Sequence, residues 1–341
     1  RTEALPSGAV LSFAEDREPD SPVLRDAIGA WRRMAQEPKS CEWQHLVWNR
    51  TSARALFASL SLLDEFERLK QWPERQKDLF MYVVLSRVGG VFVDADVEPL
   101  RPPTVWLDVV RRTFGDVAVE GARLVVGLEA SGSDDEAQAW RWSGRRQLAA
   151  WTVVAAPGHP AMLRAAERYL RSPTPSKWAH AHVQYMHSIA MGPGLLTAVV
   201  DEWLRQRHGT SIECLPYAAR GATTKVSLAG DTVLLGIDGF GCGQPHSGSR
   251  ACNATEGGAL VRHLFAGAWK AAHMAEGIED DWVGPIRRRR TGAELKDWRL
   301  PAVALMAHAR ASGIDLTWDI LPLLFSRVVP IEPPLLPPPP G

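Results

Sequence analysis

The hydrophobic pattern of the first third of the chain alternates between strand-like and helix-like spacing. Short apolar runs predict strands over 10–13 and 43–48. Apolar stripes predict three helices: one that begins at Ser21-Pro22, one over 53–57 and one over 60–69. A break follows at Trp72-Pro73. Strands that alternate with helices in this way indicate an α/β protein with a doubly wound sheet.

The stretch 78–100 carries the clearest pattern in the chain. Apolar residues first recur at helical spacing, and Gly89-Gly90 then ends the helix, because glycine reaches positive φ without a Cβ penalty. Residues 91–93 are apolar and predict a short buried strand. Asp94 and Asp96 follow at its carboxyl end, which is the edge where ligands bind in open α/β sheets.

Two carboxylates at a strand end are hard oxygen ligands for Mg²⁺ or Mn²⁺, which usually take one or two carboxylates together with substrate phosphates. A bare Asp-x-Asp is more often a solvated turn than a metal site. Here a helix, a glycine pair and an apolar strand come before Asp94-Ala95-Asp96, and this context favours the metal site.

Composition argues against polyanion binding, and the cysteines and sequons indicate the redox compartment. With 341 residues, 45% hydrophobic and 23% charged residues and no net charge, the chain is typical of a globular protein and has no bulk attraction for polyanions. Cys242 and Cys252 flank a loop that a disulfide would close. The sequons at Asn49 and Asn253 would be glycosylated in a secretory compartment, so both features favour an oxidising lumen.

The central stretch resembles the Asp-x-Asp sugar transferases of glycosyltransferase family 32. The matching positions are Asp78, Tyr82, Gly89, Gly90, Asp94 and Asp96. Met81 stands where the family usually has an arginine that is thought to contact the donor sugar, and Lys77 or Arg75 could take over that contact. The resemblance implies a GT-A-type single Rossmann-like nucleotide-sugar-binding α/β domain with mainly helical additions. We expect it over residues 1–300, with a peripheral proline-rich segment over 301–341.

Later blocks resemble the fungal Golgi α-1,6-mannosyltransferases of that family, which initiate the outer chains of N-glycans. The blocks lie at 145–160, 240–247 and 263–270. The Gly-Pro element at 191–194 is similar to one that the family has near the acceptor side, although glycines before a helix are more often structural. By this resemblance His263 ligates the metal and Lys270 meets the diphosphate. Without the resemblance, a lone histidine such as His263 is more often a core residue, and His159 would be a surface turn histidine with no role.

The resemblance therefore implies a retaining, metal-dependent transferase that moves mannose from GDP-mannose to an N-glycan or a related mannosylated acceptor. The implied nucleotide-sugar-binding residues are Asp78, Tyr82, Gly90, Asp94 and Lys270, and the implied metal ligands are Asp94, Asp96 and His263, with Mn²⁺ or Mg²⁺ as the ion. The residues assigned to catalysis are Asp94, Asp96 and Glu129. We expect Glu129 to end the strand over 124–128 and to stabilise an oxocarbenium-like state.

Two other interpretations stay open: a non-catalytic or weakly active glycan- or nucleotide-binding relative, and a metal-dependent phosphohydrolase that uses the same carboxylates. The acidic run 134–136 is interpreted as a loop and not as a second metal site. We expect the full gene product to be a type II membrane protein of the Golgi lumen that carries an N-terminal anchor. No nucleic acid is expected as a partner.

Overall fold

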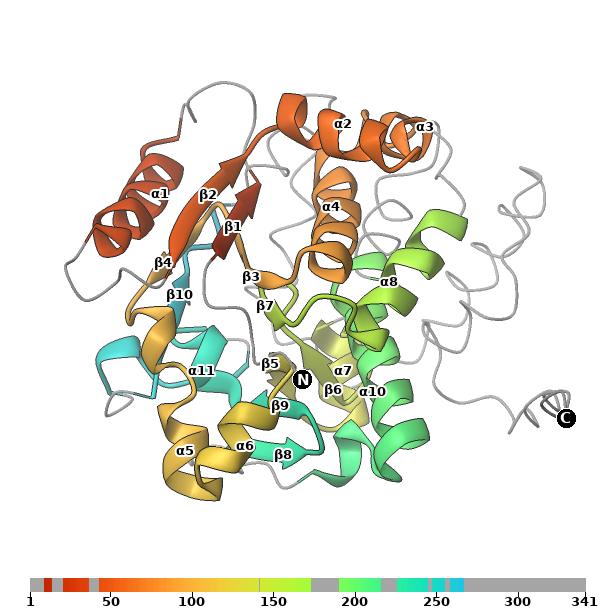
Figure 1. Cartoon of the computed structure of the whole chain (residues 1–341). Helices are drawn as coiled ribbons and strands as arrows, with labels where there is room; N and C mark the ends of the chain where they lie inside the picture. The colour runs from red at the N-terminus through yellow and green to blue at the C-terminus, as the bar shows by residue number, and fades with distance from the viewer. Residues whose placement is uncertain are drawn as a thin grey trace, which may run out of the picture.

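The structure is a computed structural model, and it describes residues 9–13, 21–36, 43–140, 142–172, 190–215, 226–244, 247–254 and 258–266. An eight-stranded sheet has the strand order β2-β1-β3-β7-β5-β9-β8, with β6 beside β5 (Figure 1). The strands of this sheet are β1 Ala9–Phe13, β2 Gln44–Trp48, β3 Gly90–Asp94, β5 Leu124–Ser131, β6 Arg146–Leu148, β7 Thr152–Ala155, β8 Val226–Ala229 and β9 Thr232–Leu235. A separate antiparallel pair joins β4, Val97–Pro99, to β10, Val261–His263.

Helices cover both faces of the sheet. Their bounds are α1 Pro22–Ala35, α2 Arg50–Ser59, α3 Leu63–Glu67, α4 Pro73–Arg87, α5 Asp108–Phe114, α6 Asp116–Gly121, α7 Asp134–Trp140, α8 Pro160–Arg171, α10 Leu195–His208 and α11 Ile237–Gly241. One core lies under α4, α8 and α10, and a second lies under α1, α5 and α11. The predicted α/β fold is confirmed, with strands 10–13 and 43–48 and the helix from Pro22 in place.

The period-two alternation of strand side chains explains why the central strand reads as continuously apolar. In β3, Phe92 packs into the core under α4, whereas Val91 and Val93 pack into the core on the other face. A strand buried on both faces cannot alternate with polar residues, so its sequence is a run of apolar side chains.

The sheet is mixed, and its parallel part places the site. β1 pairs in parallel with β2 on one side and with β3 on the other, so the chain reverses its direction of travel across the sheet between β1 and β3. In that register Asp94, the last residue of β3, lies opposite Phe13, the last residue of β1. Ligands of open α/β sheets bind at such a switch point, outside the carboxyl ends of the strands.

The predicted glycine turn between α4 and β3 is confirmed. Gly89 and Gly90 have φ values of 71° and 108°, which residues with a Cβ rarely adopt. A Cβ on Gly89 would also lie 2.6 Å from the ring of Pro157. Any side chain at position 89 would therefore displace the start of β3.

Three local predictions were wrong. The strand over 124–128 continues to Ser131, so Glu129 lies inside β5 and does not end it. The acidic run 134–136, interpreted as a loop, forms the first turn of α7, where negative side chains are favourable because they face the positive end of the helix dipole. The helix expected over 60–69 is limited to Leu63–Glu67.

His159 is not a surface residue, as its turn sequence alone suggested. It is fully buried and caps α8, where its Nδ1 accepts the Ala161 N–H at 3.3 Å. Its Nε2 lies 3.6 Å from Oδ2 of Asp231, in the turn between β8 and β9. The other oxygen of Asp231 accepts the indole N–H of Trp203 at 3.2 Å and faces His208 at 3.5 Å. His159 therefore anchors a helix to a distant hairpin.

We expect Asp231→Asn to lower the free energy of unfolding by about 1–3 kcal/mol at pH 7, because the buried His159 loses its charged partner. Burial raises the pKa of Asp231, but the hydrogen bonds and charge of His159, with Trp203 and Thr232, bring it well below its ordinary value. A depressed pKa gives stability that is present above the unfolded-state pKa of about 4 and is lost as the pH falls further.

Urea unfolding at pH 7 and pH 3 checks this expectation, because the difference between the two proteins should shrink at the lower pH. Asp64→Asn is the control, since Asp64 is exposed on α3. Equal stability of Asp231→Asn and the native protein at pH 7 would show that the ion pair contributes nothing.

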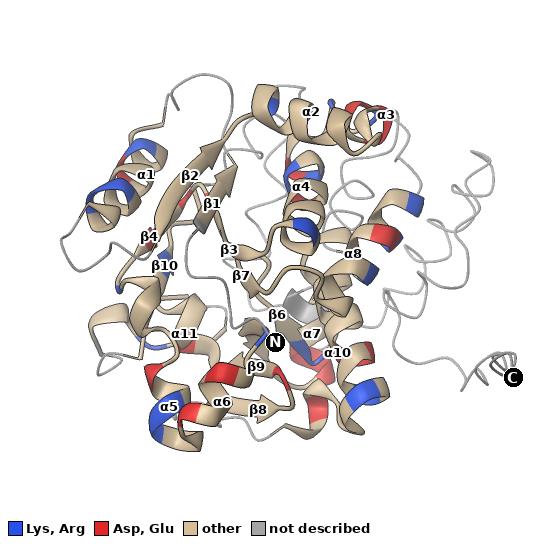
Figure 2. Ribbon diagram, viewed as in Figure 1, with Lys and Arg blue, Asp and Glu red and all other residues tan. Residues whose placement is uncertain are grey.

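The predicted disulfide is confirmed between Cys242 and Cys252. Of the two sequon asparagines, Asn49 caps α2 by accepting the Ser52 N–H at 2.8 Å, and Asn253 is exposed within the short 3-10 turn Cys252–Ala254. Among the described residues, no helix has the length and apolar character needed to cross a membrane. Residues of both charges occur on α4, α5 and α8 (Figure 2), in keeping with a chain that has no net charge.

Candidate metal and nucleotide-sugar site

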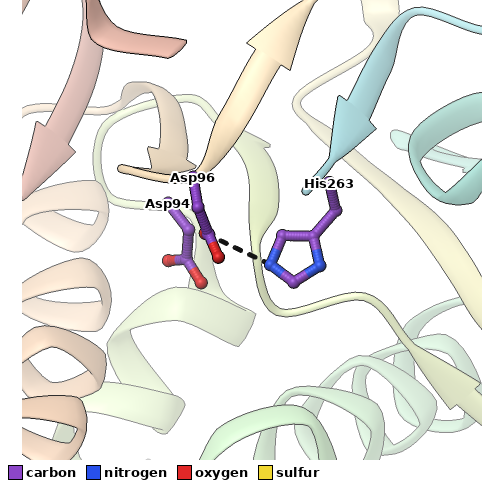
Figure 3. Close-up of side chains that lie close together, drawn as sticks. All are labelled: Asp94, Asp96 and His263. Carbon is purple, nitrogen blue, oxygen red and sulfur yellow. Dashed lines mark ion pairs between the residues drawn. The ribbon is translucent and has the colours of Figure 1, made fainter. Parts of the chain in front are cut away.

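Three predicted site residues converge from two distant parts of the chain. Asp94 ends β3, and Asp96 lies in the turn that leads to β4. His263 ends β10, whose antiparallel pairing places it opposite Val97 of β4. Figure 3 shows both carboxylates and the imidazole pointing into one space. The short β4–β10 ribbon therefore brings position 263 beside position 96.

Asp96 is the most firmly held of the three. Its Oδ1 lies 3.2 Å from Nε2 of His263, and its Oδ2 accepts the backbone N–H of Ala266 at 3.0 Å. Its own carbonyl accepts the N–H of Leu264 at 2.9 Å. Burial raises the pKa of Asp96, but the hydrogen bonds and charge of His263 and the Ala266 N–H outweigh it and bring this pKa below its ordinary value. Asp96 is thus kept ionised, as a metal ligand must be.

Aromatic side chains fix the plane of the His263 ring. Trp151 stacks on it with ring centroids 4.7 Å apart and an interplanar angle of 10°, and Phe265 meets it edge-on at 4.0 Å. The indole N–H of Trp151 donates to the carbonyl of Phe240 at 2.7 Å, so the stacking partner is itself anchored. The sequence did not predict that Trp151 and Phe265 hold the His263 ring; Trp151 was noted only as part of the block 145–160 that resembles the fungal enzymes.

The arrangement of Asp94, Asp96 and His263 fits a divalent cation. One ligand atom from each residue can be chosen so that all three lie within 4.8 Å of one another, and no other such group of three occurs among the described residues. The buried Oδ1 of Asp94 makes no hydrogen bond and has only an ionic contact. Two carboxylates and one imidazole suit Mn²⁺ or a similar ion, with further positions left for phosphate oxygens and water.

Lys77 lies at the centre of the site. The sequence suggested this residue only as a substitute for the missing arginine. Nζ of Lys77 is 2.8 Å from Oδ1 of Asp78, and 3.0 and 3.2 Å from Oδ1 and Oδ2 of Asp94. One ammonium group therefore bridges the predicted sugar-side and metal-side carboxylates.

These buried charges change one another's protonation. Burial raises the pKa of Asp78 to about 6, and Lys77 opposes this shift. Burial also raises the pKa of Asp94, again against Lys77. For Lys77, burial lowers the pKa, but the two carboxylates outweigh it and bring the pKa far above the ordinary value. Lys77 thus stays charged across the physiological range.

Tyr82 and Asp78 connect α4 to the Gly-Pro segment at Ala190–Gly194. The hydroxyl of the fully buried Tyr82 donates to the carbonyl of Gly192 at 2.7 Å. A Cβ on Gly192 would lie 3.0 Å from Oδ2 of Asp78, so the glycine allows the close approach of this carboxylate. Met81 is also fully buried and belongs to the core under α4.

Glu129 lies on β5, which β7 separates from β3 in the sheet, and it has a fixed partner. The amide Nε2 of Gln147 donates to Oε2 of Glu129 at 2.7 Å. The amide cannot turn around without loss, because its Oε1 accepts the N–H of Ser143 at 2.7 Å. Burial raises the pKa of Glu129 to about 7, although Gln147 and the charge of His263 lower it. Gln147 was not predicted as a site residue.

The remaining predicted residues divide between the fold and the undescribed segment. Gly90 begins β3, as the turn requires. Lys270 lies outside the described residues, so its contact with a diphosphate stays a prediction.

The comparisons with known proteins agree with the residues at this site. Residues 24–112, which include Asp94 and Asp96, match the family described as glycosyltransferase sugar-binding region containing DXD motif. This region of the chain is similar to that family. The family resemblance predicted from the motif is confirmed.

Two similar proteins of known name are fungal mannosyltransferases. The initiation-specific alpha-1,6-mannosyltransferase of Schizosaccharomyces pombe is 28% identical over 244 residues, covering 67% of this chain and 56% of the relative. The enzyme of the same name from Candida albicans is 26% identical over 223 residues, covering 58% of this chain and 54% of the relative. The chain thus spans about half the length of each relative.

A solved chain of PaToxG glycosyltransferase aligns with a TM-score of 0.32 at 9% identity, over 60% of this chain and 73% of that chain. This likeness is too weak to support an argument.

Proposed function

We propose that the protein is a retaining, metal-dependent glycosyltransferase that transfers mannose from GDP-mannose to an N-glycan or a related mannosylated acceptor. The observation that supports this most directly is the group Asp94, Asp96 and His263 at the switch point of the sheet. The names of the relatives support mannose as the transferred sugar and an α-1,6 linkage as the product.

The ion is assigned to Asp94, Asp96 and His263, and when bound it would neutralise charge that develops on the leaving diphosphate. His263 would hold the ion through an imidazole nitrogen, in a ring plane set by Trp151 and Phe265. Asp96 keeps its orientation through the Ala266 N–H. Because these side chains are already held in place, little reorganisation is needed when the donor binds.

Among the remaining residues, we assign Asp78 to the donor sugar, Lys77 to the donor diphosphate and Glu129 to the reacting centre. Asp78 is held against Gly192 and offers a carboxylate to sugar hydroxyls, while Lys77 supplies the positive charge that Met81 cannot. Glu129, aligned by Gln147, would stabilise positive charge at the anomeric carbon.

The test is turnover of GDP-mannose with Mn²⁺ and an α-linked mannooligosaccharide acceptor, compared with UDP-glucose under the same conditions. We expect transfer only with Mn²⁺ and acceptor together, and an α-anomeric product by NMR. Release of GMP and mannose 1-phosphate at the same rate without acceptor would indicate a phosphohydrolase instead. Nucleotide binding without turnover would indicate a non-catalytic relative.

We place the protein in the Golgi lumen, as the oxidised Cys242–Cys252 pair and the named fungal relatives support.

A further inference from the structure

Lys77 occupies both oxygens of a proposed metal ligand. Its Nζ lies 3.0 Å from Oδ1 and 3.2 Å from Oδ2 of Asp94, so the ammonium contacts both oxygens of this carboxylate. The same ammonium lies 2.8 Å from Oδ1 of Asp78, and the Lys77 side chain is 20% exposed. A metal that binds Asp94 must therefore share the carboxylate with a cation already in place.

The charges around Lys77 make this sharing unfavourable for a metal alone. Asp78, Asp94 and Asp96 supply three negative charges, and Lys77 balances one of them. A divalent ion would neutralise the two remaining negative charges, but the ammonium on the same Asp94 carboxylate would repel it. A diphosphate removes this conflict, because its oxygens can bind the metal and accept hydrogen bonds from Lys77 at the same time.

We propose that Lys77 couples metal binding to diphosphate binding: its ammonium holds Asp94 in the metal-free protein and moves to a phosphate oxygen when a metal and a nucleoside diphosphate bind together. Lys77 is thus a positioning residue that disfavours the metal alone and favours the metal–diphosphate complex. This inference rests on the proposed function, since it takes Asp94 as a metal ligand and the donor as a diphosphate.

Coupling between two ligands is reciprocal, so GDP should raise the affinity for Mn²⁺ by the same factor by which Mn²⁺ raises the affinity for GDP. In the native protein we expect this factor to be at least about tenfold, the usual effect of one charge-assisted hydrogen bond. Lys77→Met should bind Mn²⁺ alone more tightly than the native protein and bind GDP in saturating Mn²⁺ more weakly. These two changes have opposite signs, which general damage to the site would not produce.

The experiment is isothermal titration of the full chain with MnCl₂ alone, with GDP alone, and with each in the presence of the other. Lys77→Arg keeps the charge and should retain most of the coupling. Lys70→Met, which removes an exposed lysine before α4, is the matched control and should behave as the native protein.

The native protein tests the proposal even if Lys77→Met does not fold, because equal Mn²⁺ affinity with and without GDP would overturn it. A Lys77→Met protein in which both affinities fall, or neither changes, would also overturn it. Mn²⁺-dependent transfer of mannose in the same preparation would then show that only the role of Lys77 is wrong. The absence of both Mn²⁺ binding and transfer would instead reject the proposed function itself.

Discussion

Asp96→Asn is expected to lower the affinity for GDP in Mn²⁺ by more than about 100-fold. The melting temperature should fall only a little, because the lost ionic contact with His263 is partly offset by weaker repulsion of the nearby Asp94 carboxylate. The asparagine oxygen can still accept the backbone N–H of Ala266, which the native carboxylate accepts at 3.0 Å. The lost charge is the one that faces His263 and the proposed ion. The substitution therefore removes a ligand and leaves the local backbone in place.

Titration with GDP in the presence and absence of Mn²⁺, together with a thermal melt, checks this expectation. Asp64→Asn carries the same chemical change on an exposed position of α3 and should have no effect on either measurement. If Asp96→Asn binds GDP in Mn²⁺ as tightly as the native protein does, Asp96 is not a ligand. In that case its role is limited to holding the turn that ends in Ala266.

The sequence predicted the parts of the site that are close together along the chain. The helix, the glycine turn and the strand that lead to Asp94 and Asp96 are local patterns with local physical causes. His263 is different, since it reaches Asp96 through a three-residue pairing of β10 with β4. Nothing in the periodicity of a three-residue strand indicates its distant partner, so only the family resemblance suggested His263.

Lys77 and His159 show why long-range electrostatic contacts escape sequence reasoning. Adjacent residues of a helix point about 100° apart, so the helical spacing of Lys77 and Asp78 does not by itself predict an ion pair between them. The flexible lysine stem brings Nζ to both Asp78 and Asp94. His159 follows a Pro-Gly pair, a typical surface turn, but it is buried where Asp231 of the β8–β9 hairpin and Trp203 of α10 contact it.

Glu129→Gln is expected to lower the rate of mannose transfer by about 10²–10³-fold and to leave the affinity for GDP in Mn²⁺ nearly unchanged, because the carboxylate would act only on charge that develops in the transition state. The amide has almost the same shape, so packing against β6 is preserved. Single-turnover transfer rates and GDP titration measure the two quantities separately.

The pH dependence gives a test that a structural role would not pass. Burial raises the pKa of Glu129 to about 7 in the metal-free protein, and the Gln147 amide lowers it. A bound cation lowers this pKa in native and variant protein alike. If the ionised form is required, the rate falls as the pH drops through the pKa of Glu129. Gln147→Leu removes the donor at 2.7 Å, so this fall should begin at a higher pH than in the native protein.

Gln206→Leu is the matched control for Gln147→Leu. Its amide also donates to a glutamate, Glu202 at 3.0 Å, but on the exposed side of α10. The transfer rate of this variant should follow the native pH profile. An unchanged profile in Gln147→Leu, or native turnover in Glu129→Gln, would show that Glu129 does not stabilise the transition state. The charge at the anomeric carbon would then have to be balanced by the leaving diphosphate alone, which is itself held by the metal.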